Sequence, residues 1–82
     1  MNKEMEVLTA YIREETGFTG VLNAEDDLLI LGVLDSFNIV SLAMFAQEQF
    51  GVEFEGEDLV RDNLAQLSSL VALIRARKKS VN

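Results

Sequence analysis

Five serine hydroxyls are the candidate nucleophiles of this 82-residue chain, at positions 36, 41, 68, 69 and 80. The chain contains no Cys and no His, which is the usual base for a serine nucleophile. The same absences exclude a disulfide framework and a zinc site of the usual kind. The sequence therefore predicts a protein that is not an enzyme and has no catalytic residues, in which a serine serves as a substrate.

Asp26 and Asp27 are adjacent carboxylates of a kind that can bind a cation or perform acid–base chemistry. Nothing near them provides the alternating Asp or Asn ligands, the central Gly and the terminal Glu of a calcium loop. We therefore expect solvated surface charge here, and no metal site.

Ser36 stands where a loop leads into a predicted helix, directly after Asp35 and shortly after Gly32. Asp and Ser are both common as N-cap residues. A hydroxyl at this place is exposed, and it lies at the positive end of the helix dipole, where a phosphate group is favourably placed. Position alone leaves two interpretations open: Ser36 is only an N-cap, or it is a site of attachment.

Charge is distributed unevenly along the chain, which has 14 acidic and 7 basic residues and a net charge of −7. Four of the basic residues stand together near the end: Arg75, Arg77, Lys78 and Lys79. The acidic remainder would repel a phosphate backbone, so we expect no nucleic-acid partner. We expect the basic cluster to complement the dipole of a last helix, with a membrane or RNA tag as the alternative.

Hydrophobic residues make up 49% of the chain, which is too many for a disordered acidic tail. No apolar run approaches the ~20 residues that a membrane span needs. Residues 1–11 include Lys3, Glu4 and Glu6 and lack the apolar core of a signal peptide, which predicts a cytoplasmic protein. Without a repeat or a linker, residues 1–82 are expected to form a single domain.

The spacing of apolar residues predicts an all-α fold. We expect four helices: 3–16, 36–50, a short one over 56–61, and a last one that begins after the possible caps Asp62 and Asn63. Gly17 and Gly51 follow the first two helices as stop signals. The expected architecture is a small four-helix bundle with three main helices and one short helix.

A long loop over residues 18–34 connects the first two helices. Its apolar run, Leu28 to Leu31, neither alternates strictly nor has the length of a helix. A strand over 28–34 is the competing interpretation, but no second strand exists to pair with it. We therefore expect the leucines of this loop to lie across the core, which Phe50 also helps to fill.

The second helix has apolar residues on two sides. Leu42, Ala43, Ala46 and Phe50 can supply a face to the core. The second set, Phe37, Val40 and Met44, is then expected to be exposed, with core packing as the alternative.

One motif in this arrangement resembles the acyl and peptidyl carrier protein family. The resemblance rests on the run Leu31-Gly32-Val33-Leu34-Asp35-Ser36-Phe37 and on the residues that follow it: Val40, Leu42, Met44, Glu48, Phe50, Gly51, Glu53 and Phe54. It extends over nearly the whole chain, because the order of helices and loops is also similar.

The resemblance implies that Ser36 receives a 4'-phosphopantetheine arm from coenzyme A on a separate phosphopantetheinyl transferase, with Asp35 as the acid of the motif. The arm ends in a thiol that holds cargo as a thioester. Implied partners are an acyl- or aminoacyl-loading ligase and downstream acyl-processing enzymes, with the carrier itself a monomer. Phe37, where the family usually has Leu, is implied to dock with partners, together with Val40, Met44, Glu48 and Glu53.

The second helix departs from that of fatty-acid carriers. Ser41 and Gln47 stand where Glu is common, and the acidic residues gather instead in the connector that follows: Glu53, Glu55, Glu57 and Asp58. This favours a discrete carrier of specialised metabolism, in polyketide, nonribosomal peptide or aminoacyl pathways. The alternatives are a carrier of fatty-acid synthesis and an unmodified acidic helical adaptor.

Overall fold

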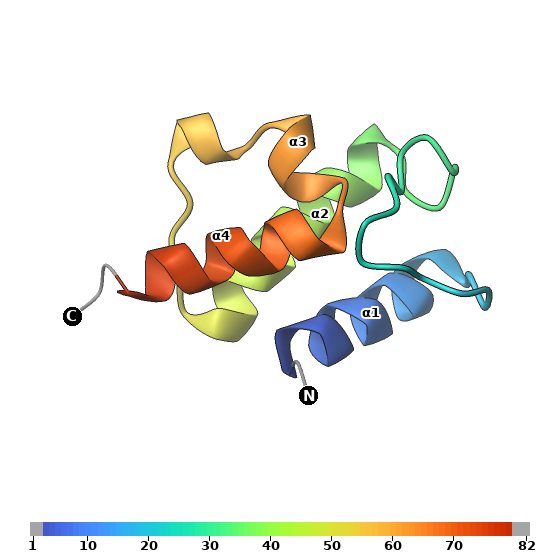
Figure 1. Ribbon diagram of the computed structural model, residues 1–82, viewed down its shortest axis with the longest axis horizontal. Coiled ribbons are helices and arrows are strands. Elements are labelled where there is room, and N and C mark those ends of the chain that lie inside the picture. The colour runs from blue at the N-terminus through green and yellow to red at the C-terminus, as the bar shows by residue number, and fades with distance from the viewer. Residues whose placement is uncertain (1–2, 80–82) are drawn as a thin grey trace.

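Helices account for all regular secondary structure within residues 3–79, the part of the chain that the computed structural model describes. In chain order they are α1 (Lys3–Thr16), α2 (Ser36–Phe50), the 3-10 turn η1 (Gly56–Asp58), α3 (Arg61–Leu64) and α4 (Leu67–Lys79), as Figure 1 shows. The predicted all-α, four-helix fold with a long loop between the first two helices is confirmed. The bounds of α1 and α2 are those that the sequence predicts.

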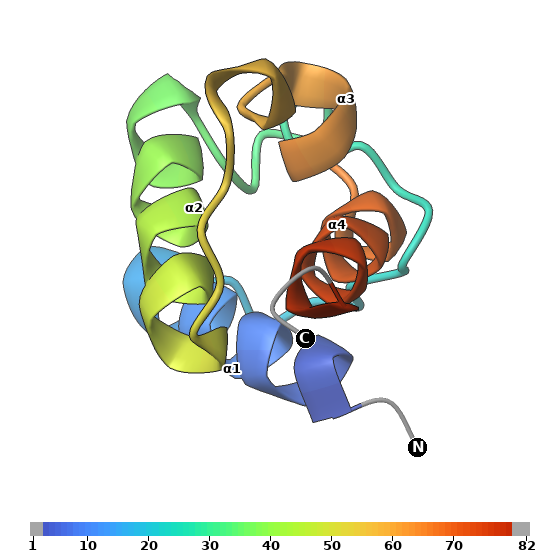
Figure 2. The ribbon, with the colours of Figure 1, turned by 90° about the vertical axis from the view of Figure 1, so that its left-hand side faces the viewer.

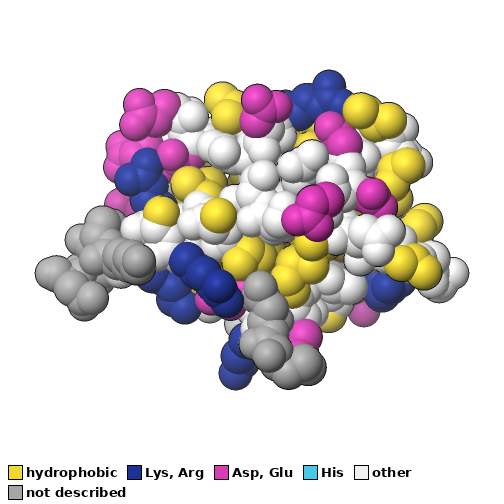
Figure 3. Space-filling view, viewed as in Figure 1, with side chains coloured by type: hydrophobic (Ala, Val, Ile, Leu, Met, Phe, Trp, Pro, Cys, Tyr) yellow, Lys and Arg dark blue, Asp and Glu magenta, His cyan; other side chains and the backbone are white. Residues whose placement is uncertain are grey.

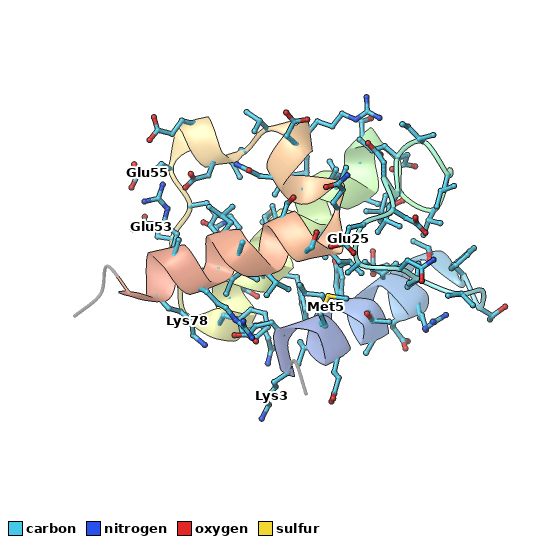
Figure 4. All side chains as sticks on the ribbon, viewed as in Figure 1. Lys3, Met5, Glu25, Glu53, Glu55 and Lys78 are labelled. Atoms are coloured by element: carbon cyan, nitrogen blue, oxygen red, sulfur yellow. The ribbon has the colours of Figure 1, made fainter. Side chains whose placement is uncertain are left out.

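The three long helices pack against one another around one core. In Figure 2, α2 and α4 stand on opposite sides and α1 lies across their base. Apolar side chains at helical spacing meet in the middle, and the largest fully buried ones are Leu8, Ile12, Leu28, Leu42, Leu67, Leu70 and Ile74. In Figure 4, Met5 points from α1 toward α4, and it packs against this core.

The loop between α1 and α2 is held by the backbone of Leu28. The Leu28 amide donates to the carbonyl of Ala65 (3.0 Å), and the Leu28 carbonyl accepts the amides of Val33 (3.0 Å) and Leu34 (3.1 Å). Leu28 is fully buried, and Val33 and Leu34 are buried with it. The prediction that this loop contributes to the core is therefore confirmed for Leu28.

The same prediction is wrong for the end of the apolar run. Ile30 and Leu31 are 74% and 58% exposed, and Leu29 is half-buried against the core. The reason is the turn that brings Val33 back to Leu28, because the residues at its crest point outward. Gly32 completes the turn with φ +77°, a conformation that suits glycine. Phe50, also expected in the core, is half-buried at its edge.

The segment between α2 and α4 differs from the single short helix expected over 56–61. It forms η1 and, after Leu59 and the extended Val60, α3. Asp62 and Asn63 lie inside α3, so they are not caps of α4, which begins only at Leu67. The cause is Asp58, whose carboxylate accepts the Glu55 amide (2.7 Å) and whose carbonyl accepts the Asn63 side chain (2.9 Å).

Three of the clustered cations tie the end of α4 to distant segments. Arg77 donates twice to the buried Asp58 carboxylate, at 2.8 and 2.7 Å. Arg75 (3.1 Å) and Lys78 (3.8 Å) pair with Glu4 at the start of α1. Their place at the end of α4 agrees with the dipole argument, but the sequence analysis missed these ion pairs, which join elements far apart in the chain.

We predict that Leu28→Ala lowers the free energy of unfolding by about 2–5 kcal/mol, because it leaves a cavity where a fully buried side chain stood. Leu31→Ala is the matched control, since it makes the same change at an exposed side chain, and its effect should stay within about 0.5 kcal/mol. Urea unfolding followed by circular dichroism measures both. Equal losses of unfolding free energy in Leu28→Ala and Leu31→Ala would show that the loop is placed wrongly.

We predict a second effect on stability from acid. The hydrogen bonds from Arg77 lower the pKa of Asp58 below its ordinary value of 3.8, and the Glu55 amide adds to this. A carboxyl with a lowered pKa stabilises the fold above its unfolded-state pKa, and this contribution is lost as the pH falls through the folded-state pKa. Urea midpoints should therefore fall as the pH drops below about 4.

Asp58→Asn should be less stable at neutral pH and should show a shallower loss in acid. The matched control is Glu57→Gln, which removes the same charge from an exposed side chain of the same turn. It should keep the acid profile of the unchanged protein. If Asp58→Asn also kept that profile, the Arg77–Asp58 pair would not be the group that titrates.

Candidate functional site

The start of α2 is fixed by Asp35. This residue is the N-cap, and its Oδ1 accepts the amides of Phe37 (2.9 Å) and Asn38 (2.7 Å). Ser36 is the first residue of the helix, one position further along. The interpretation of Ser36 as only an N-cap is therefore wrong, while the capping role expected for Asp35 is confirmed.

The Ser36 side chain is exposed. Among residues 3–79, no hydrogen bond engages its hydroxyl, because Asp35 already serves the free amides of the first turn. The hydroxyl is thus held at a fixed place by the helix, and it is not needed to maintain that helix.

A cleft of about 260 Å³ opens beside Ser36, between α2 and the segment from η1 to α3. Its lining is largely apolar: Leu29, Ile39, Val40, Ala43, Met44, Leu59, Val60 and Leu64, with Ser36, Gln47 and Arg61 as the polar members. Leu59 and Val60 are both about half exposed, so an apolar wall faces solvent here. The cleft can therefore receive an apolar or amphipathic chain attached near Ser36.

Gln47 links the connector after α2 to the helix, a role that the sequence analysis missed. Its Oε1 accepts the Phe54 amide (2.8 Å), and its Nε2 donates to the Ala43 carbonyl (3.4 Å). An uncharged amide can both donate and accept, whereas an ionised Glu can only accept. Gln at this position thus holds the connector after α2 against the helix.

Phe37, Val40 and Met44 are 77%, 56% and 61% exposed. Their expected exposure is confirmed, since α2 turns Leu42, Ala43 and Ala46 to the core instead. The exposed set begins next to Ser36 and follows α2, so the structure brings these sequence-predicted residues together on the same helix.

Glu48 and Glu53 are exposed as well, but they lie far from Ser36. Glu48 follows Ser36 by twelve positions in α2, which corresponds to about 18 Å along the helix axis. Glu53 and Glu55 point outward from the connector in Figure 4. Acidic side chains gather over this region at the upper left of Figure 3, while the right-hand edge, over the loop after α1, is largely apolar.

Asp27 is more than the solvated surface charge that the sequence predicts. Its Oδ1 accepts the amides of Leu29 (3.0 Å) and Ile30 (3.1 Å), and its Oδ2 pairs with Arg61 at 3.1 Å. Asp26 accepts a hydrogen bond from the side chain of Asn23 (3.1 Å). Within the described part of the chain, no group of three or more acidic side chains is placed to hold a metal ion.

A family model described as a phosphopantetheine attachment site matches residues 6–74 of this chain. The chain belongs to this family. Its members are carriers that hold 4'-phosphopantetheine covalently and are not themselves enzymes, and this protein is therefore such a carrier. Neither the comparison with curated proteins nor that with solved structures gives a significant match.

The family also defines the kind of partner that the carrier has: a phosphopantetheinyl transferase and acyl-processing enzymes. A separate observation concerns membranes: none of the helices within residues 3–79 has the length and apolar character to span one.

Proposed function

We propose that Ser36 carries the phosphopantetheine arm, and that the protein is a discrete carrier that presents a thioester-bound acyl or aminoacyl group to partner enzymes. The proposal rests on one observation: the Ser36 hydroxyl is exposed, does not cap the helix, and lies at the mouth of an apolar cleft. The residues present fit the group, since the attachment oxygen is accessible and the cleft can receive the chain that extends from it.

In the loading step, Ser36 Oγ attacks a phosphorus of the coenzyme A pyrophosphate. A new O–P bond forms, the pyrophosphate P–O bond breaks, and adenosine 3',5'-bisphosphate leaves. The hydroxyl proton passes to a base of the transferase, because this chain has no His, the usual base for a hydroxyl nucleophile. Once bound, the arm supplies the thiol that this chain lacks.

We further propose that the carrier serves specialised metabolism, in polyketide, nonribosomal peptide or aminoacyl pathways, rather than fatty-acid synthesis. The character of α2 supports this, since its exposed surface near Ser36 is apolar, its one acidic residue, Glu48, lies near its far end, and further acidic residues follow in the connector. The docking role of Phe37, Val40, Met44, Glu48 and Glu53, the monomeric state and the cytoplasmic location belong to the same proposal.

We predict that Ser36→Ala takes up no phosphopantetheine when it is incubated with coenzyme A and a broad-specificity transferase. Intact-mass spectrometry should show one added group on the unchanged protein and none on the variant. Ser41→Ala, on the same helix, is the matched control and should still be modified. Modification of Ser36→Ala would refute the assignment of the site, and an unmodified natural sequence would support the adaptor instead.

We also predict that Phe37→Ala and Met44→Ala leave thermal unfolding nearly unchanged but lower the rate of arm transfer several-fold. Exposed apolar side chains add little to stability, yet they can anchor an interface, where truncation often costs more than ~1 kcal/mol. Val21→Ala is the control, because Val21 is as exposed as Phe37 but lies in the loop after α1. If all three substitutions lowered the rate of arm transfer equally, α2 would not be the docking helix.

The acidic side chains extend the same prediction. Charges at the rim of an interface act mainly on the association rate, and salt screens them. Glu48→Lys should therefore slow association with a basic partner more at low salt than at high salt, as surface plasmon resonance can measure. A rate that is indifferent to salt would show that Glu48 and Glu53 do not steer partners.

A further inference from the structure

Among the residues that the structure describes, Arg61 is the one cation that lines the cleft beside Ser36. The other described cations are engaged elsewhere or lie far away. Arg13 donates to the carbonyls of Phe18 and Gly20, and Arg75, Arg77 and Lys78 pair with acids at the end of α4. In a chain with a net charge of −7, a positive group at this position needs a reason.

A phosphodiester on Ser36 would be poorly served by the start of α2 alone. The free amides of a helix N-terminus usually bind a phosphate. Here the Asp35 carboxylate already accepts the amides of Phe37 and Asn38. A new negative charge on Ser36 would therefore adjoin a fixed carboxylate, and it requires a cationic partner from another element.

The contact that now holds Arg61 can be released without disturbing the loop. Asp27 uses Oδ1 to accept the amides of Leu29 and Ile30, whereas Arg61 binds only the other oxygen, Oδ2, at 3.1 Å. The Arg61 side chain is 52% exposed, and so exposed an ion pair holds its partners weakly. The planar fork of a guanidinium also suits phosphate oxygens better than an ammonium does.

We propose that Arg61 moves from Asp27 to the phosphodiester on Ser36 when the carrier is modified, and that it thereby positions the arm along the cleft. This inference rests on the proposed attachment at Ser36. Arg61 is a positioning residue: it takes no part in the bond that forms or breaks. In the unmodified protein, Asp27 keeps it at the edge of the cleft.

This movement of Arg61, from Asp27 to the phosphodiester, can be detected without measuring any enzyme activity. In the unmodified carrier the Ile30 amide lowers the pKa of Asp27 most, and Arg61 lowers it further. Departure of Arg61 would remove one of these causes and leave the amides in place. The pKa of Asp27 should therefore rise on modification, but stay below its ordinary range.

The experiment follows the Asp27 carboxyl by NMR titration in the unmodified and modified carriers, with the ³¹P shift of the phosphodiester as a second signal. Arg61→Gln isolates the exchange, because only the charge of the phosphate then acts on Asp27. The rise of the Asp27 pKa should be larger with Arg61 than with Gln, and Arg61→Lys should restore part of the difference. Lys3→Gln, at the far side of the molecule in Figure 4, is the control for loss of one positive charge and should behave as the unchanged protein.

Equal rises in the natural sequence and in Arg61→Gln would overturn the proposal for Arg61, while the added mass would still support attachment at Ser36. Absence of the added mass would instead refute the proposed function. If Arg61→Gln failed to fold, Arg61→Lys would take its place: a smaller rise of the Asp27 pKa in Arg61→Lys than in the natural sequence would support the proposal, and an equal rise would overturn it.

Discussion

The backbone of Leu28 organises the half of the molecule that holds the candidate site. Its carbonyl accepts two amides, from Val33 and Leu34, and its own amide donates to Ala65 just before α4. With its side chain fully buried, this residue fixes a loop that has no regular structure of its own. Asp35 and Ser36 follow directly, so the orientation of α2 at its first turn depends on where Leu28 is held.

Ion pairs add to the small core in holding the helices together. Two buried acids, Glu4 and Asp58, accept Arg75 and Arg77, and these pairs join the start of α1 and the turn η1 to the end of α4. Figure 1 shows the connector after α2 rising past that end of α4 to reach η1. Two contacts therefore support the wall of the cleft opposite α2: the ion pair between Arg77 and Asp58, and the hydrogen bond from the Phe54 amide to Gln47.

Local patterns were sufficient to predict much of this structure. The bounds of α1 and α2 follow from apolar spacing and from Gly17 and Gly51, and the division of α2 into a core face and an exposed face follows from periodicity. The bounds of η1, α3 and α4 could not be predicted in the same way, because they depend on Asp58 and its contacts with Asn63 and Arg77. The outward positions of Ile30 and Leu31 likewise depend on a turn closed by Leu28. For the site, the motif indicated Ser36 and Asp35, whereas Arg61 and Gln47 have no local signal, since their roles arise only where separate segments meet.

The helix cap and the exposed hydroxyl belong to different residues, Asp35 and Ser36, and this affects competition among carriers. Because Asp35 alone holds the start of α2, a chain without the Ser36 hydroxyl keeps the same outer surface as a functional one. If Ser36 carries the arm and partner enzymes recognise α2, as we propose, such a chain would be a decoy: it would occupy those enzymes and deliver nothing to them. On that proposal, loss of the single Ser36 oxygen atom would turn the carrier into an inhibitor of its own pathway, and the inhibition would grow with the abundance of the altered chain.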